Sequence, residues 1–112
     1  MVEYKSNSNL SVILKAVSDD TRRSLLTRLC QEGPCRVTDL AAAYKMSLNA
    51  ISKHLKILEN AGLVKRQTMG REHWISADLS NTEQIEDWFS QLKSIWLLRL
   101  EKLESMLGED ND

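Results

Sequence analysis

The chain has 112 residues, of which 42% are hydrophobic and 28% charged, and its formal net charge is −1. This length predicts one domain over residues 1–112, with a modest core that oligomerisation would help to stabilise. Its apolar runs are far shorter than the ~20 residues of a membrane span, and its first ten residues lack the apolar stretch of an export signal. Two cysteines are too few for a disulfide scaffold and fit a reducing compartment, so we expect a cytoplasmic protein that binds no membrane.

Two amphipathic helices are predicted first. Apolar residues recur at helical spacing from position 10, and again from position 25 within a second helix over residues 21–31. One residue of the segment 18–20 would cap the second helix, and Gly33 with Pro34 would end it. The two apolar stripes are Leu10, Ile13, Leu14 and Val17, and Leu25, Leu26, Leu29 and Cys30.

A helix-turn-helix is predicted over residues 37–60. Thr38 can cap a short helix, 39–45, and Ser47 can cap a longer one that runs from Leu48 to about Asn60. Two helices joined by a turn this short are the signature of the motif. The short helix is expected to bury Leu40, Ala41 and Tyr44.

The hydrophobic period changes after the second of these helices. Residues 63–76 contain two short runs rich in Val, Thr, Trp and Ile, which predict a β-hairpin, or wing, that turns at Gly70. Asp78 or Ser80 would then cap a long final helix over residues 81–107. The expected fold is mainly α with a small β-hairpin, a winged helix-turn-helix with a trailing helix.

Charge is unevenly distributed along the chain. Residues 36–73 carry a net charge of +4 and residues 77–112 a net charge of −6, so a polyanion would dock on the middle of the chain. On a helical wheel the predicted helix Leu48–Asn60 has two sides. Its apolar side holds Ile51, Leu55 and Leu58, and its opposite side, the recognition face, holds Asn49, Ser52, Lys53 and Lys56. Such side chains can bind base edges and phosphates in a major groove.

The predicted wing is basic near its tip. A cationic two-stranded ribbon can follow a minor groove or a phosphate backbone. Trp74 and Ile75 are expected to pack into the core, and His54 is expected to pack at the junction of helix and hairpin. The wing residues predicted to contact DNA are Lys65, Arg66, Arg71 and His73.

Four stretches resemble the ArsR-type winged-helix transcriptional regulators: LKAVSDDTRRSLLTRL (14–29), VTDLAAAYKMSLNAISKHLKILENAGLVKR (37–66), GREHWISAD (70–78) and, for a branch that generally lacks metal sites, WFSQLKSIWLLRLEKLESML (88–107). The resemblance implies a symmetric dimer built from the first and last helices. It also implies that Leu48, Asn49, Ser52 and Lys53 read DNA. The family often has Gln at the position of Leu48, where an apolar contact to a thymine methyl is the alternative.

The last helix also predicts a dimer from its own residues. Its apolar stripe is too broad and too aromatic for a small core to absorb, although both tryptophans could belong to the protomer core instead. A homodimer would present two recognition helices about 34–36 Å apart to successive major grooves of a palindromic operator in double-stranded DNA. The expected interface residues are Leu10, Ile13, Leu14, Trp88, Leu92, Ile95, Trp96 and Leu103.

The sequence therefore predicts a DNA-binding repressor rather than an enzyme, with no metal site and no cofactor. Alignment places Arg36 and Thr38 where metal-sensing relatives have two cysteines, and no histidine lies in the last helix. Two alternatives stay open, a winged helix that binds protein partners and a repressor switched by oxidation of Cys30 and Cys35. Release by an unknown small-molecule inducer, constitutive binding, the operator and the regulated genes are also open.

Overall fold

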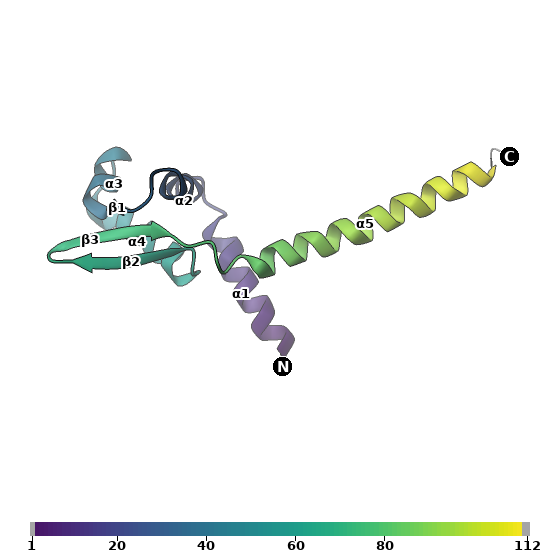
Figure 1. Cartoon of the computed structure of the whole chain (residues 1–112), viewed down its shortest axis with the longest axis horizontal. Coiled ribbons are helices and arrows are strands. Elements are labelled where there is room, and N and C mark those ends of the chain that lie inside the picture. The colour runs from purple at the N-terminus through teal and green to yellow at the C-terminus, as the bar shows by residue number, and fades with distance from the viewer. Residues whose placement is uncertain (1, 111–112) are drawn as a thin grey trace. The chain divides into compact units, whose positions relative to one another are not determined.

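The computed structural model describes residues 2–110, and the side chains of residues 9–108. The chain divides into two compact units, one that ends at Thr82 and one that consists of the last helix. The single domain over residues 1–112 stays a prediction. Within the described part of the chain, no helix is both long enough and apolar enough to cross a bilayer. The elements are α1 (Val2–Ala16), α2 (Asp20–Glu32), β1 (Cys35–Arg36), α3 (Val37–Ala43), α4 (Leu48–Asn60), β2 (Val64–Met69), β3 (Glu72–Ala77) and α5 (Glu83–Asp110) (Figure 1).

The three strands form one antiparallel sheet in the order β1-β3-β2. The β2–β3 hairpin pairs from Val64 with Ala77 to Met69 with Glu72, and its turn lies at the free end of the ribbon (Figure 1). Gly70 has φ +65° at the first central position of this two-residue turn, as a type II′ turn requires. The predicted wing is confirmed, with each strand displaced by one residue.

The strand β1 has no counterpart among the predicted elements. Cys35 pairs with Ile75 and Arg36 with Trp74. A strand of two residues is too short to show alternation, and only Pro34, which cannot continue the preceding helix, indicates extended backbone here.

The core lies in the first unit, where α2, α3 and α4 pack against the sheet and α1 packs against α4. Cys30, expected on the apolar stripe of α2, is exposed instead, and Arg22 occupies a buried position on that helix. Ile75 is buried as expected, whereas Trp74 is only half-buried. The fully buried large side chains are Leu25, Leu29, Leu40, Ile51, Leu55, Leu58, Leu63 and Ile75.

The start of α3 differs from the prediction. The helix begins at Val37, directly after extended Arg36, so Thr38 lies inside the first turn and caps nothing. The start of α4 is confirmed, because Ser47 accepts a hydrogen bond from the Ala50 amide at 3.1 Å. A side-chain cap therefore starts α4 but not α3.

Both helices of the motif end in Schellman motifs. At the end of α4 the amide of Leu63 donates to the Leu58 carbonyl and Gly62 has φ +75°. At the end of α3 the amide of Met46 donates to the Ala41 carbonyl, but the left-handed position is taken by Lys45, with φ +53°. A side chain at such a position strains the backbone.

The start of α5 also differs from the prediction. The helix begins at Glu83 rather than at residue 81. The carboxylate of Asp78 accepts hydrogen bonds from the amide and hydroxyl of Ser80, so both candidate caps form a turn before the helix.

Replacing Lys45 with glycine should stabilise the protein, because glycine removes the left-handed strain. We expect Lys45→Gly to raise the free energy of unfolding by about 0.5–1 kcal/mol in urea denaturation. Lys56→Gly is the matched control, since Lys56 is exposed inside α4, and it should lower that free energy by about 1 kcal/mol. A loss of stability in Lys45→Gly equal to that of the control would contradict the assignment.

Candidate nucleic-acid interface

The α4 helix separates its apolar and polar residues onto opposite sides, as predicted. Ile51, Leu55 and Leu58 are 0% exposed. Across the helix, three of the four residues of the recognition face are exposed and Ser52 is half-buried. Leu48, in the first turn, is 52% exposed. The buried residues thus fix the polar side outward.

The basic residues differ in whether protein carboxylates already compensate them. Lys65 Nζ lies 3.4 Å from Asp78 Oδ2, and Arg66 Nε lies 3.8 Å from Glu59 Oε1. Hydrogen bonds from Ser80, together with the Lys65 charge, lower the pKa of Asp78. Among residues 9–108, the basic residues Lys53, Lys56 and Arg71 form no ion pair with a carboxylate, so their charge is the most available to a polyanion.

Arg36 was not among the predicted site residues, yet it connects the wing to the helix-turn-helix. Its guanidinium lies 2.6 Å from Glu72 Oε2 on β3 and 3.0 Å from Asp39 Oδ2 on α3. These two carboxylates, Glu72 first, raise the pKa of Arg36. The i,i+3 spacing of Arg36 and Asp39 could have indicated the pair, whereas the contact with Glu72 depends on the fold.

A hollow of about 420 Å³ lies between α3, α4 and the wing. Its lining combines an apolar wall with hydroxyl and cationic groups and with one carboxylate, that of Glu72, which is paired with Arg36. Hydroxyl and cationic groups are those that contact a sugar–phosphate backbone. His73 contributes to it and lies 3.4 Å from Thr68 Oγ1 across the hairpin. Residues from all three elements line the hollow, among them Arg36, Thr38, Leu48, Ser52, Arg71 and His73.

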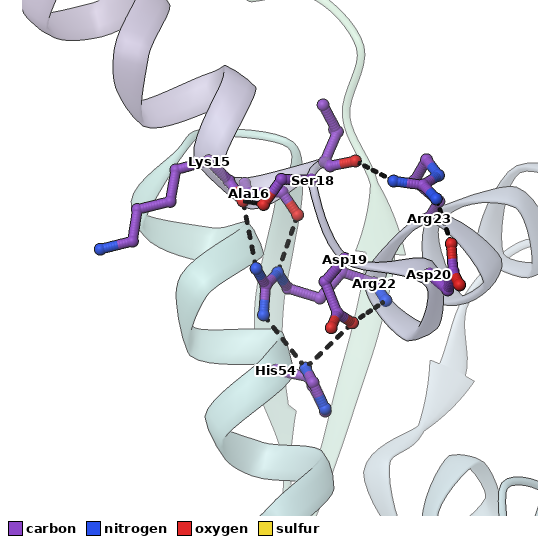
Figure 2. Close-up of polar contacts among 9 residues, drawn as sticks. Lys15, Ala16, Ser18, Asp19, Asp20, Arg22, Arg23 and His54 are labelled. Carbon is purple, nitrogen blue, oxygen red and sulfur yellow. Dashed lines mark hydrogen bonds and ion pairs between the residues drawn. The ribbon is translucent and has the colours of Figure 1, made fainter.

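His54 is half-buried, as expected of a packed side chain, but its polar partners do not lie on the hairpin. Its Nδ1 lies 3.4 Å from Arg22 Nη1 and 3.8 Å from Asp19 Oδ2, at the corner between α1 and α2 (Figure 2). Asp19 caps α2 by accepting from the Arg22 amide, and this hydrogen bond is the main reason why the pKa of Asp19 is lowered. His54 is therefore part of the body of the protein rather than of the recognition face.

The predicted interface residues fall into three groups. Trp88, Leu92, Ile95, Trp96 and Leu103 on α5 are between 37% and 65% exposed, and Leu10 and Leu14 on α1 are half-buried. Ile13 is 5% exposed within the single chain. Its side chain therefore packs in the protomer core, and the assignment of Ile13 to an interface stays a prediction.

The two cysteines are both free thiols. Cys30 is exposed, whereas Cys35 is half-buried beside Glu32. Burial, followed by the negative charge of Glu32, raises the pKa of the Cys35 thiol, which disfavours the reactive thiolate. Within the described residues, no group of three or more His, Cys, Asp or Glu side chains is arranged to hold a metal ion.

These elements define a class of protein. Two helices meet through a turn of four residues, 44–47, and a two-stranded wing follows the second helix. This arrangement is the winged helix-turn-helix.

Comparison with known proteins gives the family. The profile described as bacterial regulatory protein, arsR family, matches residues 19–66. The arsenical resistance operon repressor of Bacillus subtilis (strain 168) is 36% identical over 69 residues, which are 62% of this chain. The matched stretch covers 64% of that repressor, so the chain spans just under two thirds of its length.

Solved structures agree with this match. The crystal structure of an ArsR family transcriptional regulator is 30% identical with a TM-score of 0.74, over 80% of this chain and 92% of that one. An ArsR-like transcriptional regulator from Rhodococcus sp. RHA1 is 27% identical with a TM-score of 0.76, over 91% and 95% of the two chains. The chain belongs to the ArsR family of transcriptional regulators, which are not enzymes.

Freeing Arg66 from its carboxylate partner should strengthen binding to a polyanion. We expect Glu59→Gln to elute from heparin at a higher salt concentration than the unmodified protein, because Arg66 loses its competing ion pair. Glu101→Gln on α5 is the control, since it changes the net charge equally outside this surface. Equal shifts for both variants would show that only net charge matters.

Proposed function

We propose that this chain is a sequence-specific DNA-binding repressor that acts as a homodimer on a palindromic operator and does not respond to metal. The observation that carries the proposal is the orientation of α4. Three fully buried aliphatic residues hold it in the core, while Asn49, Lys53 and Lys56 are exposed on its other side. A helix of this width fits a major groove.

The recognition face supplies groups that distinguish bases. The Asn49 carboxamide can bond an adenine edge in bidentate fashion, and Lys53 can donate to the acceptors of guanine. The exposed side chain of Leu48 offers an apolar contact to a thymine methyl instead of a hydrogen bond. In this proposal these three residues carry most of the sequence preference.

The remaining basic residues bind phosphates. Lys56 and Arg71 are exposed and without ion pairs among the described side chains, and the hollow beside the wing adds Arg66 and His73. Lys65 and Arg66 contribute less in this proposal because Asp78 and Glu59 already compensate their charges. Phosphate contacts place the wing without selecting a sequence.

The homodimer is supported by the apolar surface of α5. Trp96, Ile95 and Leu103 are each more than half exposed, and a patch this apolar is typical of an interface. Two copies joined through α1 and α5 would place two α4 helices one helical turn of DNA apart, about 34–36 Å. This spacing requires a palindromic operator.

Metal-independent action is supported by the side chains at positions 36 and 38, where metal-sensing relatives have two cysteines. Arg36 is engaged with two carboxylates and Thr38 has no soft ligand atom, so neither offers the thiolate that a soft metal ion prefers. In our proposal the signal that releases this chain from DNA is a small molecule or the concentration of the protein itself.

Mutation of the recognition face should separate sequence reading from phosphate binding. We expect Lys53→Ala to weaken binding to a selected operator by about 1–3 kcal/mol with little effect on random duplex. Arg71→Ala should weaken binding to both duplexes equally. Fluorescence anisotropy over a salt series measures this, with a log–log slope of about −0.9 for each neutralised phosphate. Binding that does not depend on salt would favour a protein-binding winged helix.

A charge placed on the apolar side of α5 should dissociate the dimer. We expect Trp96→Glu to weaken the dimer by about 2 kcal/mol or more, because a central tryptophan is a typical hot spot. Sedimentation equilibrium measures the loss. Leu98→Glu is the matched control, because Leu98 is also exposed but lies ~160° around the helix from Trp96. A dimer that persists in Trp96→Glu would exclude this side of α5 from the interface.

A further inference from the structure

The side chain of Arg22 is the one charged group buried in the core among residues 9–108, at 9% exposed. Its Nε donates to the Ala16 carbonyl at 2.8 Å and its Nη2 to the Lys15 carbonyl at 3.1 Å. These are the last two residues of α1, where the helix dipole favours a cation. Arg22 is thus anchored to the end of α1.

The third contact of this guanidinium is to the recognition helix. Arg22 Nη1 lies 3.4 Å from His54 Nδ1, as Figure 2 shows. Arginine can only donate, so this contact is a hydrogen bond in the tautomer whose Nδ1 accepts and whose proton lies on Nε2. The planar fork of one buried side chain therefore bridges the end of α1 and the middle of α4.

The Arg22 bridge constrains the position of α4 more tightly than hydrophobic packing requires. Ile51, Leu55 and Leu58 already hold α4 in the core, and aliphatic contacts tolerate small rotations and shifts of a helix. Hydrogen bonds from a rigid guanidinium fix both distance and direction. The Arg22 bridge therefore determines the orientation of α4 relative to α1 more narrowly than the core alone.

We propose that Arg22 is a positioning residue that, through His54, sets the orientation of α4 relative to α1 and so the spacing of the two half-sites that the dimer accepts. The inference rests on the proposed function, because half-site spacing matters only if two copies joined through α1 read DNA. Neither residue touches DNA in this account.

The test uses His54 variants that differ in one property. His54→Leu removes the acceptor and His54→Gln replaces it with an amide oxygen. The full-length wild-type chain first selects its preferred palindromic duplex from a random pool, and duplexes with the half-site separation changed by one base pair in each direction are then prepared. Anisotropy gives the affinity of each protein for each duplex.

The spacing preference is the ratio of the affinity for the selected duplex to the affinity for the duplexes with altered half-site separation. We expect this ratio to be about 3- to 30-fold lower in His54→Leu than in the wild type, with a smaller change in affinity for random duplex. His54→Gln should retain that preference. Arg22→Lys is a second test, since an ammonium keeps the charge but not the planar fork, and it should behave like His54→Leu. Ile75→Val controls for a general loss of stability, because it trims the core without touching this bridge.

The outcomes separate the two proposals. Unchanged spacing preference in a folded, dimeric His54→Leu or Arg22→Lys would overturn the inference and leave the proposed function standing. An equal loss of preference in Ile75→Val would overturn it as well, since stability alone would then explain the effect. If the wild-type chain selects no duplex, the proposed function fails and the inference fails with it.

Discussion

The burial of Ile51, Leu55 and Leu58 on one side of α4 is the constraint on which the rest of the structure depends. Each fully buried side chain of this size contributes about 1.5–3 kcal/mol. Turning the helix by half a revolution would expose all three and bury Lys53 and Lys56, whose charges could not be left unpaired in the core. The outward direction of the recognition face therefore follows from the hydrophobic core, and not from any contact with a ligand.

The surface around this helix is organised by local backbone motifs and by ion pairs. Schellman turns at Lys45 and Gly62 end the two motif helices, and Arg36 joins the wing to α3 through Glu72 and Asp39. Internal carboxylates compensate Lys65 and Arg66. Among the described side chains of this surface, Lys53 and Lys56 of α4 and Arg71 at the turn of the wing keep an uncompensated charge. This is where a winged helix approaches a duplex.

Regular periodicity made α4 and the wing predictable from the sequence, because each presents a pattern that depends only on its own residues. The features that sequence reasoning missed depend on neighbours distant in the chain. The two-residue β1 is defined by its pairing with β3, and His54 faces a corner formed by α1 and α2. Ile13 and Cys30 have ambiguous positions on apolar stripes, and only the packed helices show that one is buried and the other exposed.

The most direct test of the account is an NMR titration of the isotopically labelled full chain with the palindromic duplex that it selects. The account predicts that the largest changes in amide chemical shift, and their loss at high salt, fall on Asn49, Ser52 and Lys53 in α4 and on Arg71 in the wing. Changes confined to α5, or to the core side of α4, would contradict it.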